Sequence, residues 1–391
     1  MKLQDVCELF TDGDWIESKD QSDEGIRLVQ TGNIGIGKYL EKEGKEKYIS
    51  KDTFKSLNCT EIYPGDVLIS RLPEPVGRGC IIPEKNERMI TAVDCTICRV
   101  NEKIVDKKYF CYYLQSPTYY NQLEQSVTGT TRKRISRKNL GNVEMSIPEK
   151  EKQIEIINVL DKVTTLIEER KEELQKLDEL IKARFIELFG NPVLNPIGWP
   201  VKRLGDITTK IGSGATPKGG KESYREDGIS LIRSMNVHNG KFEYKDLAHI
   251  SDEQAERLDN VTLEMDDVLL NITGASVARC CIVPADVLPA RVNQHVCIVR
   301  CKEFISPEFL NCLLIEDNYQ DLLWGIAGSG ATREAITKQQ VEDLQIIIPP
   351  ETMQREFTTF VKQIDKSKVA VQKALEEAQL LFDSLMQKYF G

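Results

Sequence analysis

The densest group of side chains that could bind an anion is a short basic run rich in glycine and threonine. It comprises Gly129, Thr130, Thr131, Arg132, Lys133 and Arg134. Glycine lets a backbone approach a phosphate closely, and threonine and arginine donate hydrogen bonds to it. A counterpart further along the chain keeps Thr332 and Arg333. The pattern predicts contacts to phosphate or sugar; the alternative is a solvated loop before a helix.

Arginine and asparagine also flank or end several apolar runs that resemble strands. They are Arg71, Arg78, Arg233, Asn236, Asn271 and Arg279. These side chains can pair in a bidentate way with guanine and adenine, so each is a candidate for contact with a base. Pairing with the many acidic residues is the competing explanation. A further stretch, "GSGATPKGGK", supplies Lys218 and Lys221 but lacks the spacing of a nucleotide-binding loop. It is either a loop against a nucleic-acid backbone or a solvated one.

The sequence contains no recognisable catalytic or metal-binding constellation. Cys95 and Cys98 have the spacing of a zinc pair, but no second pair follows and the run around them is typical of a strand. The three histidines show neither triad nor zinc spacing, and "NPVL" and "NPIG" are not the catalytic tetrapeptide of a DNA methyltransferase. We therefore expect no catalytic residues, no metal and no cofactor.

Composition sets limits on the surface and the compartment. The 391 residues carry a net charge of −9, which argues against a wholly basic DNA-binding surface. Locally, residues 101–150 and 201–250 are net basic, so a DNA surface must be a patch. No apolar run has the length of a membrane span, the first residues are not those of a secretory signal, and the cysteines are typical of reduced, buried thiols. We expect a cytoplasmic protein without a membrane contact.

The chain is an internal repeat, which is its strongest signal. "DVL" at Asp66 returns at Asp267, and the Val, Arg, Cys and Pro of "VGRGCIIP" return in "VARCCIVP" at the same spacing of 201 residues. "FG" at Phe189 returns at Phe390. One spacing that holds over so long a stretch indicates a tandem duplication of a unit of about 190 residues.

Each unit changes its pattern once. The first part has short β-branched runs broken by Gly and Pro: "IRLVQTGNI", "DVLIS", "GCIIP" and "CTICRV", then "ISLIRSMNV", "DVLLNI", "CCIVP" and "VCIVR". They predict strands of a mixed α/β domain. A helical stretch follows in each unit, over 107–125 and 307–324.

The second part of each unit predicts one long helix. Apolar residues recur every three or four positions: Leu160, Val163, Ile167, Leu174, Leu177 and Ile181, then Val361, Ile364, Val371, Leu375, Phe382 and Leu385. This is the pattern of a coiled-coil seam. A helix over 151–189 would measure roughly 58 Å at about 1.5 Å per residue. Such a stripe must be buried, either on the helix's own domain or on the other helix.

We expect an α+β protein with two tandem recognition-type domains, each followed by a long helix. The helices form an antiparallel coiled coil that relates the domains by a pseudo-two-fold axis. The predicted segments are domain 1 (1–148), helix 1 (149–190), a linker (191–200), domain 2 (201–348) and helix 2 (349–391).

The sequence resembles the specificity (S) subunits of type I restriction–modification systems over nearly its whole length. "WPVKRLGDITTKIGSGATP" is similar to the opening of the family's target-recognition domain, and "MDDVLLNITGASVARCCIVP" with "ARVNQHVCIVR" is similar to its middle. "GSGATREAITKQQVEDLQIIIPP" resembles the segment before the spacer helix, and the first unit repeats most of these motifs. It departs from them where "TDGDW" replaces "GSGATP".

The resemblance implies a non-catalytic subunit that binds double-stranded DNA. Each domain reads one half of a bipartite target, the helices set the gap, and they dock two methyltransferase (modification) subunits. An endonuclease subunit can join. The alternative from a different class is a coiled-coil adaptor that binds proteins without recognising DNA.

Overall fold

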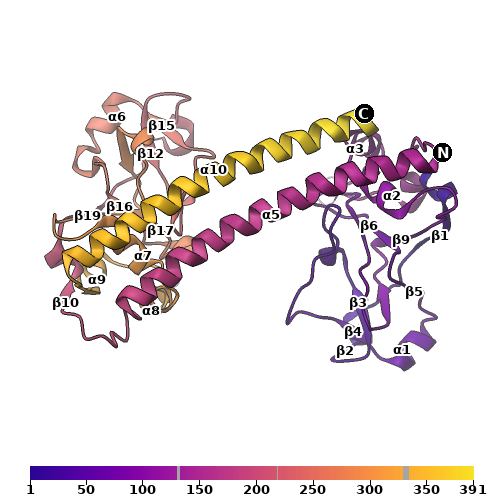
Figure 1. Cartoon of the computed structure of the whole chain (residues 1–391), viewed down its shortest axis with the longest axis horizontal. Helices are drawn as coiled ribbons and strands as arrows, with labels where there is room; N and C mark the ends of the chain where they lie inside the picture. Colours follow the sequence, from indigo (N-terminus) through magenta and orange to yellow (C-terminus); the bar gives the residue numbers. More distant parts are fainter. Residues whose placement is uncertain (130–132, 218, 329–333) are drawn as a thin grey trace. The chain divides into compact units, whose positions relative to one another are not determined.

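The computed structural model describes residues 1–129, 133–217, 219–328 and 334–391, without the side chain of Lys221. The chain forms two compact units. Unit 1 is Met1–Lys171 with Lys373–Gly391, and unit 2 is Glu172–Gln372. Each unit therefore contains one mixed α/β domain and one half of each long helix, α5 (Lys150–Phe189) and α10 (Glu351–Phe390) (Figure 1).

Domain 1 contains two sheets. An antiparallel sheet has the order β1-β9-β6-β7, and a mixed sheet has the order β2-β4-β3-β8-β5. The strands are β1 (Cys7–Asp12), β2 (Gln21–Ser22), β3 (Ile26–Val29), β4 (Tyr48–Ile49), β5 (Glu61–Ile62), β6 (Val67–Ser70), β7 (Gly79–Ile81), β8 (Met89–Thr91) and β9 (Cys95–Val100). β3 and β6 are buried along their whole length, which explains their unbroken apolar runs.

Domain 2 repeats this plan. Its antiparallel sheet has the order β11-β19-β16-β17, and a mixed sheet has the order β15-β12-β18. The strands are β10 (Val201–Arg203), β11 (Thr208–Ser213), β12 (Ile229–Ile232), β13 (Val237–His238), β14 (Lys241–Phe242), β15 (Ala248–Ile250), β16 (Val268–Asn271), β17 (Cys280–Ile282), β18 (Ala290–Val292), β19 (Val296–Cys301) and β20 (Gln345–Ile347). The eight β-branched runs of the sequence all contain strands, as predicted.

A matching ion pair fixes the antiparallel sheet in each domain. The buried Asp66 accepts two hydrogen bonds from Arg99, at 2.9 and 2.8 Å. The buried Asp267 accepts two from Arg300, both at 2.8 Å. The duplication therefore extends to the polar interior, and not only to the apolar runs.

The helical stretch in each domain is two helices, where the sequence pattern predicted one. α2 (Lys107–Tyr113) is followed by α3 (Pro117–Glu124), and α7 (Pro307–Leu314) by α8 (Asp317–Gly328). Ser116 caps α3 by accepting a hydrogen bond from the backbone of Tyr119, with Pro117 in the first turn. Glu316 accepts one from the backbone of Tyr319 in the same way. These caps restart the helix within a continuous apolar pattern.

Shorter helices complete the domains. They are α1 (Lys51–Ser56), α4 (Arg137–Gly141), α6 (Asp252–Glu256) and α9 (Lys338–Glu342).

The long helices are α5 (Lys150–Phe189) and α10 (Glu351–Phe390). The first turn of each is tied to its own domain by a buried glutamine. Gln153 accepts a hydrogen bond from the backbone of Asp106 and donates to the carbonyl of Pro148. Gln354 makes the equivalent bonds with Ser306 and Pro349. Each long helix therefore begins at a fixed angle to the domain before it.

The two long helices pack against each other in both units, and they run antiparallel. In unit 1 the first half of α5 meets the last half of α10, where Val163 and Ile167 contact Ala378, with Leu375 beside them. In unit 2 the last half of α5 meets the first half of α10, where Ile181 shares a core with Val361. The pairing that the sequence left open is thus present, together with packing onto the domains.

Aromatic rings anchor the last turn of each long helix in the domain of the other repeat. Phe185 and Phe189 of α5 pack with Phe309 and Phe357, with ring centroids 4.9–5.7 Å apart. In unit 1, Phe390 of α10 lies 5.1 Å from the ring of Tyr109 and 6.1 Å from that of Tyr113. This explains why "FG" ends both repeats: each phenylalanine completes the core of the other repeat's domain.

The cysteines are part of the core. All are free thiols, and all but Cys7 and Cys301 are buried. Cys95 and Cys98 lie in different apolar clusters, because positions i and i+3 of a strand point to opposite faces. Burial raises the pKa of the Cys95 thiol to about 12. In the part of the chain that the structure describes, no helix has the length and apolar character needed to cross a bilayer.

Candidate nucleic-acid interface

Backbone hydrogen bonds join the two described ends of the basic Gly/Thr loop. Thr128 and Arg134 exchange two backbone hydrogen bonds, of 3.0 and 2.8 Å, and Gly129 has φ +104°. Arg134 also pairs with Asp94 at 2.8 Å, while Lys133 is exposed. Thr130, Thr131 and Arg132, the tip of the predicted contact loop, lie outside the described residues. Thr332 and Arg333 of the second copy lie outside them as well.

Arg71 contacts the chain next to this loop, at Ile135. Its guanidinium is buried and donates to the carbonyls of Val93, at 2.6 Å, and Ile135, at 3.4 Å. Its Nε lies 3.3 Å from a carboxylate oxygen of Asp12. Burial lowers the pKa of Arg71, an effect that Asp12 opposes. The structure thus gives Arg71 an internal role, and its predicted contact with a base is untested.

Arg78 is also engaged with its own domain. Nε donates to Ile34 at 2.6 Å and Nη2 to Thr31 at 2.8 Å, so the guanidinium ties down the turn that begins at Thr31. Nη1 donates to the carbonyls of Leu72 and Pro75. Four carbonyl oxygens therefore surround one buried cation.

Domain 2 holds the equivalent turn with a different residue. The carbonyls of Ser234 and Val237, which correspond to those of Thr31 and Ile34, accept from Nδ2 of Asn271 at 2.8 and 3.5 Å. Asn271 is buried. Arg279, the counterpart of Arg78, therefore does not donate to this turn. Its side chain has no hydrogen bond or ion pair among the described residues.

The side chain of Arg279 lines an open hollow of about 440 Å³. The hollow is lined by Ser234, Met235, Thr273, Gly274, Ala275, Ser276, Arg279 and His295. The hydroxyl of Thr273 lies 2.5 Å from Nδ1 of His295, and Nε2 of His295 lies 2.9 Å from the amide of Gln294. Hydroxyl, imidazole and guanidinium groups together can donate to and accept from the edges of bases.

The loop after β11 borders this hollow. Gly214 donates to the carbonyl of Asn293 at 3.0 Å, and Thr216 donates to Gln294 at 2.5 Å. A Cβ on Gly214 would lie 1.8 Å from the carbonyl oxygen of Val292, so only glycine fits. Lys218 lies outside the described residues. For Lys221, only the backbone is described, within the turn Gly220–Ser223.

The first domain keeps the same glycine despite its different sequence there. A Cβ on Gly13 would lie 2.3 Å from the carbonyl oxygen of Thr91, which corresponds to Val292. The segment "TDGDW" differs from "GSGATP" in sequence. It nevertheless keeps a glycine at the point where strand and loop approach closely, and only the residues around that glycine differ.

Asn236 and Arg233 are structural neighbours in domain 2. Asn236 is buried; its Oδ1 accepts from the backbone of Arg233 at 3.1 Å and its Nδ2 donates to Glu243 at 2.8 Å. Asn33 makes the same pair of bonds in domain 1. Arg233 donates to the carbonyl of Asp246, and its guanidinium lies 5.3 Å from the ring centroid of Tyr224.

Sequence reasoning missed two groups. His295 and Thr273 gave no spacing signal, because the strands that bring them together are distant in the chain. A basic pocket of domain 1, lined by Arg27, Lys42, Lys45 and Lys47, was hidden because its lysines alternate with glutamates in "EKEGKEK". In the described residues no group of His, Cys, Asp and Glu has an arrangement that could hold a metal ion.

The architecture defines a class: a duplicated α/β domain whose copies are joined by two paired long helices. The family "Type I restriction modification DNA specificity domain" matches residues 1–178 and 196–380, so the chain belongs to the type I restriction–modification specificity subunits. These subunits are the non-catalytic part of the type I enzyme.

Individual relatives agree over nearly the full length. The type I restriction enzyme MjaIX specificity subunit of Methanocaldococcus jannaschii is 24% identical, over 96% of this chain and 85% of that protein. The S subunit from M. genitalium has the same fold, with a TM-score of 0.56 at 14% identity, over 100% of this chain and 95% of that one. A chain from a type I R-M complex assembly also has a TM-score of 0.56, at 18% identity, over 99% and 96%.

Proposed function

We propose that this specificity subunit reads a bipartite double-stranded DNA target, with one recognition domain for each half. The observation that carries the proposal is the different use of one arginine position in the two domains. Arg78 donates to four carbonyls, whereas Arg279 lies in an open hollow and has no hydrogen bond or ion pair with the residues that the structure describes. One scaffold with two different surfaces suits two different half-site sequences.

The helices suit the role of a spacer. α5 and α10 each have 40 residues, and each is anchored by a glutamine at its start and by an aromatic side chain at its end. Two rods held at both ends resist bending better than a single linker. We infer that they set the gap between the half-sites as a geometric constant.

The same helices offer equivalent positions for two methyltransferase subunits. Leu180 on α5 is 46% exposed, and Leu381 on α10, its counterpart in the repeat, is 48% exposed. An exposed leucine at the same point of both copies is what two identical partners would use. An endonuclease subunit would join through the assembled methyltransferases. This work would take place in the cytoplasm, where the DNA lies.

The test is a binding experiment with the chain and the methyltransferase subunits encoded beside it. The complex is mixed with random-sequence duplexes, shifted fragments are sequenced, and methylated sites are mapped genome-wide. We expect two short conserved blocks separated by a constant unspecific gap. A single block, or no enrichment, would contradict bipartite reading, and a complex indifferent to DNA would favour the protein-only adaptor.

A further inference from the structure

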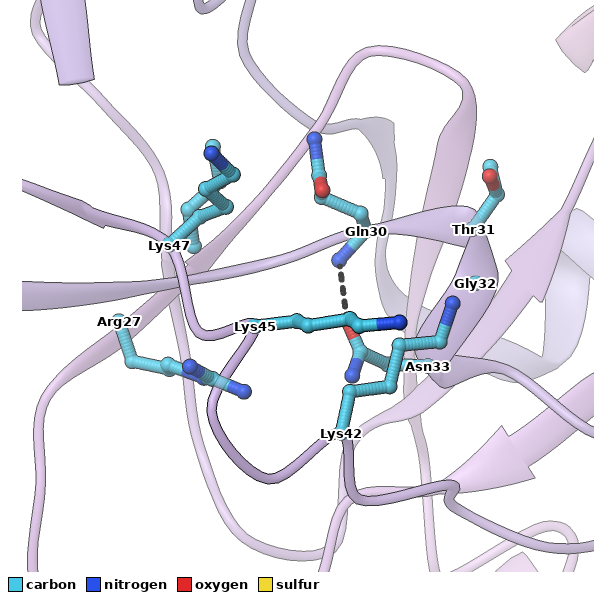
Figure 2. A pocket seen from close by; sticks show the side chains of 9 residues that line it. Arg27, Gln30, Thr31, Gly32, Asn33, Lys42, Lys45 and Lys47 are labelled. Atoms are coloured by element: carbon cyan, nitrogen blue, oxygen red, sulfur yellow. Dashed lines mark hydrogen bonds between the residues drawn. The ribbon is translucent and has the colours of Figure 1, made fainter. Parts of the chain in front are cut away.

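Domain 1 has a pocket of about 300 Å³ that concentrates positive charge. Arg27 on β3 forms one wall, and Lys42, Lys45 and Lys47 reach it from the loop before β4. Figure 2 shows the ends of the Lys42 and Lys45 side chains close to each other beside the turn that carries Gly32 and Asn33, with Arg27 on another side of the pocket.

Arg27 is a buried cation, and two of its nitrogen atoms lack a hydrogen-bond acceptor in the described part of the chain. Its side chain is 2% exposed, and its Nε and Nη1 have no hydrogen-bond partner in the described part of the chain. Nη2 lies 3.6 Å from a carboxylate oxygen of Glu41, and the guanidinium lies 5.5 Å from the ring centroid of Tyr48. Buried donors without acceptors are costly, so a ligand oxygen at this place would be stabilising.

The three lysines also have charge that is not neutralised locally. None of them makes an ion pair with a described residue, although Glu41, Glu43 and Glu46 are neighbours in sequence. Glu41 is shared: one oxygen faces Arg27 and the other lies 2.5 Å from Nζ of Lys85.

Glycine shapes the pocket. A Cβ on Gly32 would lie 2.2 Å from Nζ of Lys42, so the absence of a side chain allows this ammonium to lie over the turn.

The fold itself does not require two of these cations, Arg27 and Lys47. In domain 2, the strand position of Arg27 is Ser230, because Ile26 pairs with Ile49 as Ile229 pairs with Ile250. Lys47 is replaced by Ala248, whose strand stands in the same relation to β12. The equivalent strands form in domain 2 without the cations of Arg27 and Lys47, so the fold does not require those two charges. Lys245 stands where Lys42 does, because Glu243 accepts from Asn236 as Leu40 accepts from Asn33.

We propose that this pocket binds a phosphate group, and that the phosphate belongs to the backbone of the DNA read by domain 1. A guanidinium with two free N–H groups and three ammonium groups match the several oxygens and the charge of a phosphate. The DNA assignment rests on the proposed function; the phosphate chemistry does not. Such an anchor positions domain 1 on the DNA without reading sequence. Domain 2 has Ser230 and Ala248 where domain 1 has Arg27 and Lys47.

The first arm of the test uses inorganic phosphate and the full chain at low ionic strength, followed by isothermal titration calorimetry. The test variant is Lys42→Gln, Lys45→Gln, Lys47→Gln, which leaves the buried Arg27 intact. The matched control is Lys51→Gln, Lys55→Gln, Lys103→Gln, which removes the same charge from exposed positions of domain 1. We expect saturable binding in the wild type and the control, and its loss in the test variant.

The second arm measures DNA affinity of the assembled complex against salt concentration. Each lost phosphate contact lowers the slope of log K against log salt by about 0.9. We expect the test variant to lose about one such contact relative to the control, with no change in the preferred sequence.

The outcomes separate the two assumptions. No saturable phosphate binding in the wild type, with equal slopes for both variants, overturns the proposal. Phosphate binding that depends on the pocket lysines, with equal DNA slopes, overturns the DNA assignment and makes a free phosphate compound the ligand. If the wild-type complex ignores DNA, the proposed function fails, while the calorimetry still decides the pocket.

Discussion

At the scale of residues, Arg78 and Arg279 occupy equivalent positions but differ in what they contact. Arg78 satisfies carbonyls of the turn at Thr31, whereas Asn271 does this for the equivalent turn in domain 2. Because the same turn is satisfied by an arginine in domain 1 and by an asparagine from a different repeat position in domain 2, the surface at the arginine position can change without loss of the fold. Substitutions at the two arginines should therefore have opposite consequences.

Arg78→Ala should destabilise domain 1. It removes charge-assisted hydrogen bonds to four carbonyls, each worth about 1.5–3 kcal/mol, and leaves those carbonyls without a donor. We expect a loss of roughly 3 kcal/mol or more, seen as an earlier thermal transition for this domain in calorimetry. Arg279→Ala serves as the matched control and should shift the transition little. Equal shifts would mean that Arg279 has a structural partner.

Arg279→Ala should instead weaken reading of one half-site. A bidentate arginine contact to a base is worth about 1–3 kcal/mol of discrimination, so preference at one position of the block read by domain 2 should fall about 10- to 100-fold. Selection from random duplexes by the assembled complex measures this. Arg257→Ala, at the exposed residue that follows α6, should leave both blocks unchanged. An unaltered block read by domain 2 would remove Arg279 from the interface.

The sequence did not predict that Arg78 and Arg279 make different contacts. Arg71, Arg78, Arg279 and Asn271 all follow strand-like runs, so residue type and position gave them one shared prediction. Arg71, Arg78 and Asn271 are buried against carbonyls that include some lying 34 to 64 residues away along the chain, whereas Arg279 contacts none of them. Periodicity reports which face of an element is apolar, but it carries no information on which distant carbonyls lack a donor.

At the scale of elements, the long helices were the most predictable feature and their ends the least. A repeat of three and four residues over forty positions predicted α5 and α10 within two residues of their bounds. The same pattern did not show that Phe189 and Phe390 enter the domain of the other repeat, because an aromatic residue in the last turn looks alike in any apolar stripe. The break between α2 and α3 was missed for a related reason: Ser116-Pro117 interrupts hydrogen bonding but not apolar spacing.

A substitution in the last turn of α10 should therefore destabilise domain 1, although residues 1–150 of that domain are unchanged. Phe390→Ala deletes a ring packed on Tyr109 and Tyr113, and buried Phe→Ala substitutions cost about 3–5 kcal/mol. Hydrogen exchange should show faster opening of α2. Leu380→Ala, about three helical turns earlier at a 69% exposed position, is the control and should change little. Protection of α2 that is unaffected by Phe390→Ala would contradict the anchoring role.

The exposed leucines of the helices make a separate prediction about partners. Leu180→Glu and Leu381→Glu should each remove one of two methyltransferase subunits, because a buried unpaired carboxylate at an interface is costly. Native mass spectrometry should give one partner for each single variant and none for the double variant. Val369→Glu, at a 71% exposed site without an apolar counterpart in the repeat, is the control. Two bound subunits in the double variant would place the docking surface elsewhere.

At the scale of the whole molecule, the duplication makes one chain carry out the work of a dimer. Each compact unit takes the first half of one long helix and the last half of the other, so neither domain is complete without residues from both repeats. Sequence repetition predicted the two copies, but the exchange of helix ends is a property of the pairing. It links the stability of each domain to the integrity of both helices.

Lengthening both helices together should therefore change the gap between half-sites and nothing else. Four residues added between Lys171 and Glu172 and four between Gln372 and Lys373 fall where the chain passes from one compact unit to the other, and they leave the anchors at Phe185 and Phe390 in place. Four helical residues add about 6 Å, close to two base pairs at about 3.4 Å each.

Genome-wide mapping of methylated sites should show both blocks intact and a gap about two base pairs longer. Four residues inserted after Leu194, in the exposed loop between the helix and domain 2, provide the control and should keep the original gap, because that loop does not determine the helix length. An unchanged gap in the helix variant would mean that the separation of the half-sites is set by the methyltransferase subunits or by the DNA. The two rods would then hold the domains without measuring the distance between them.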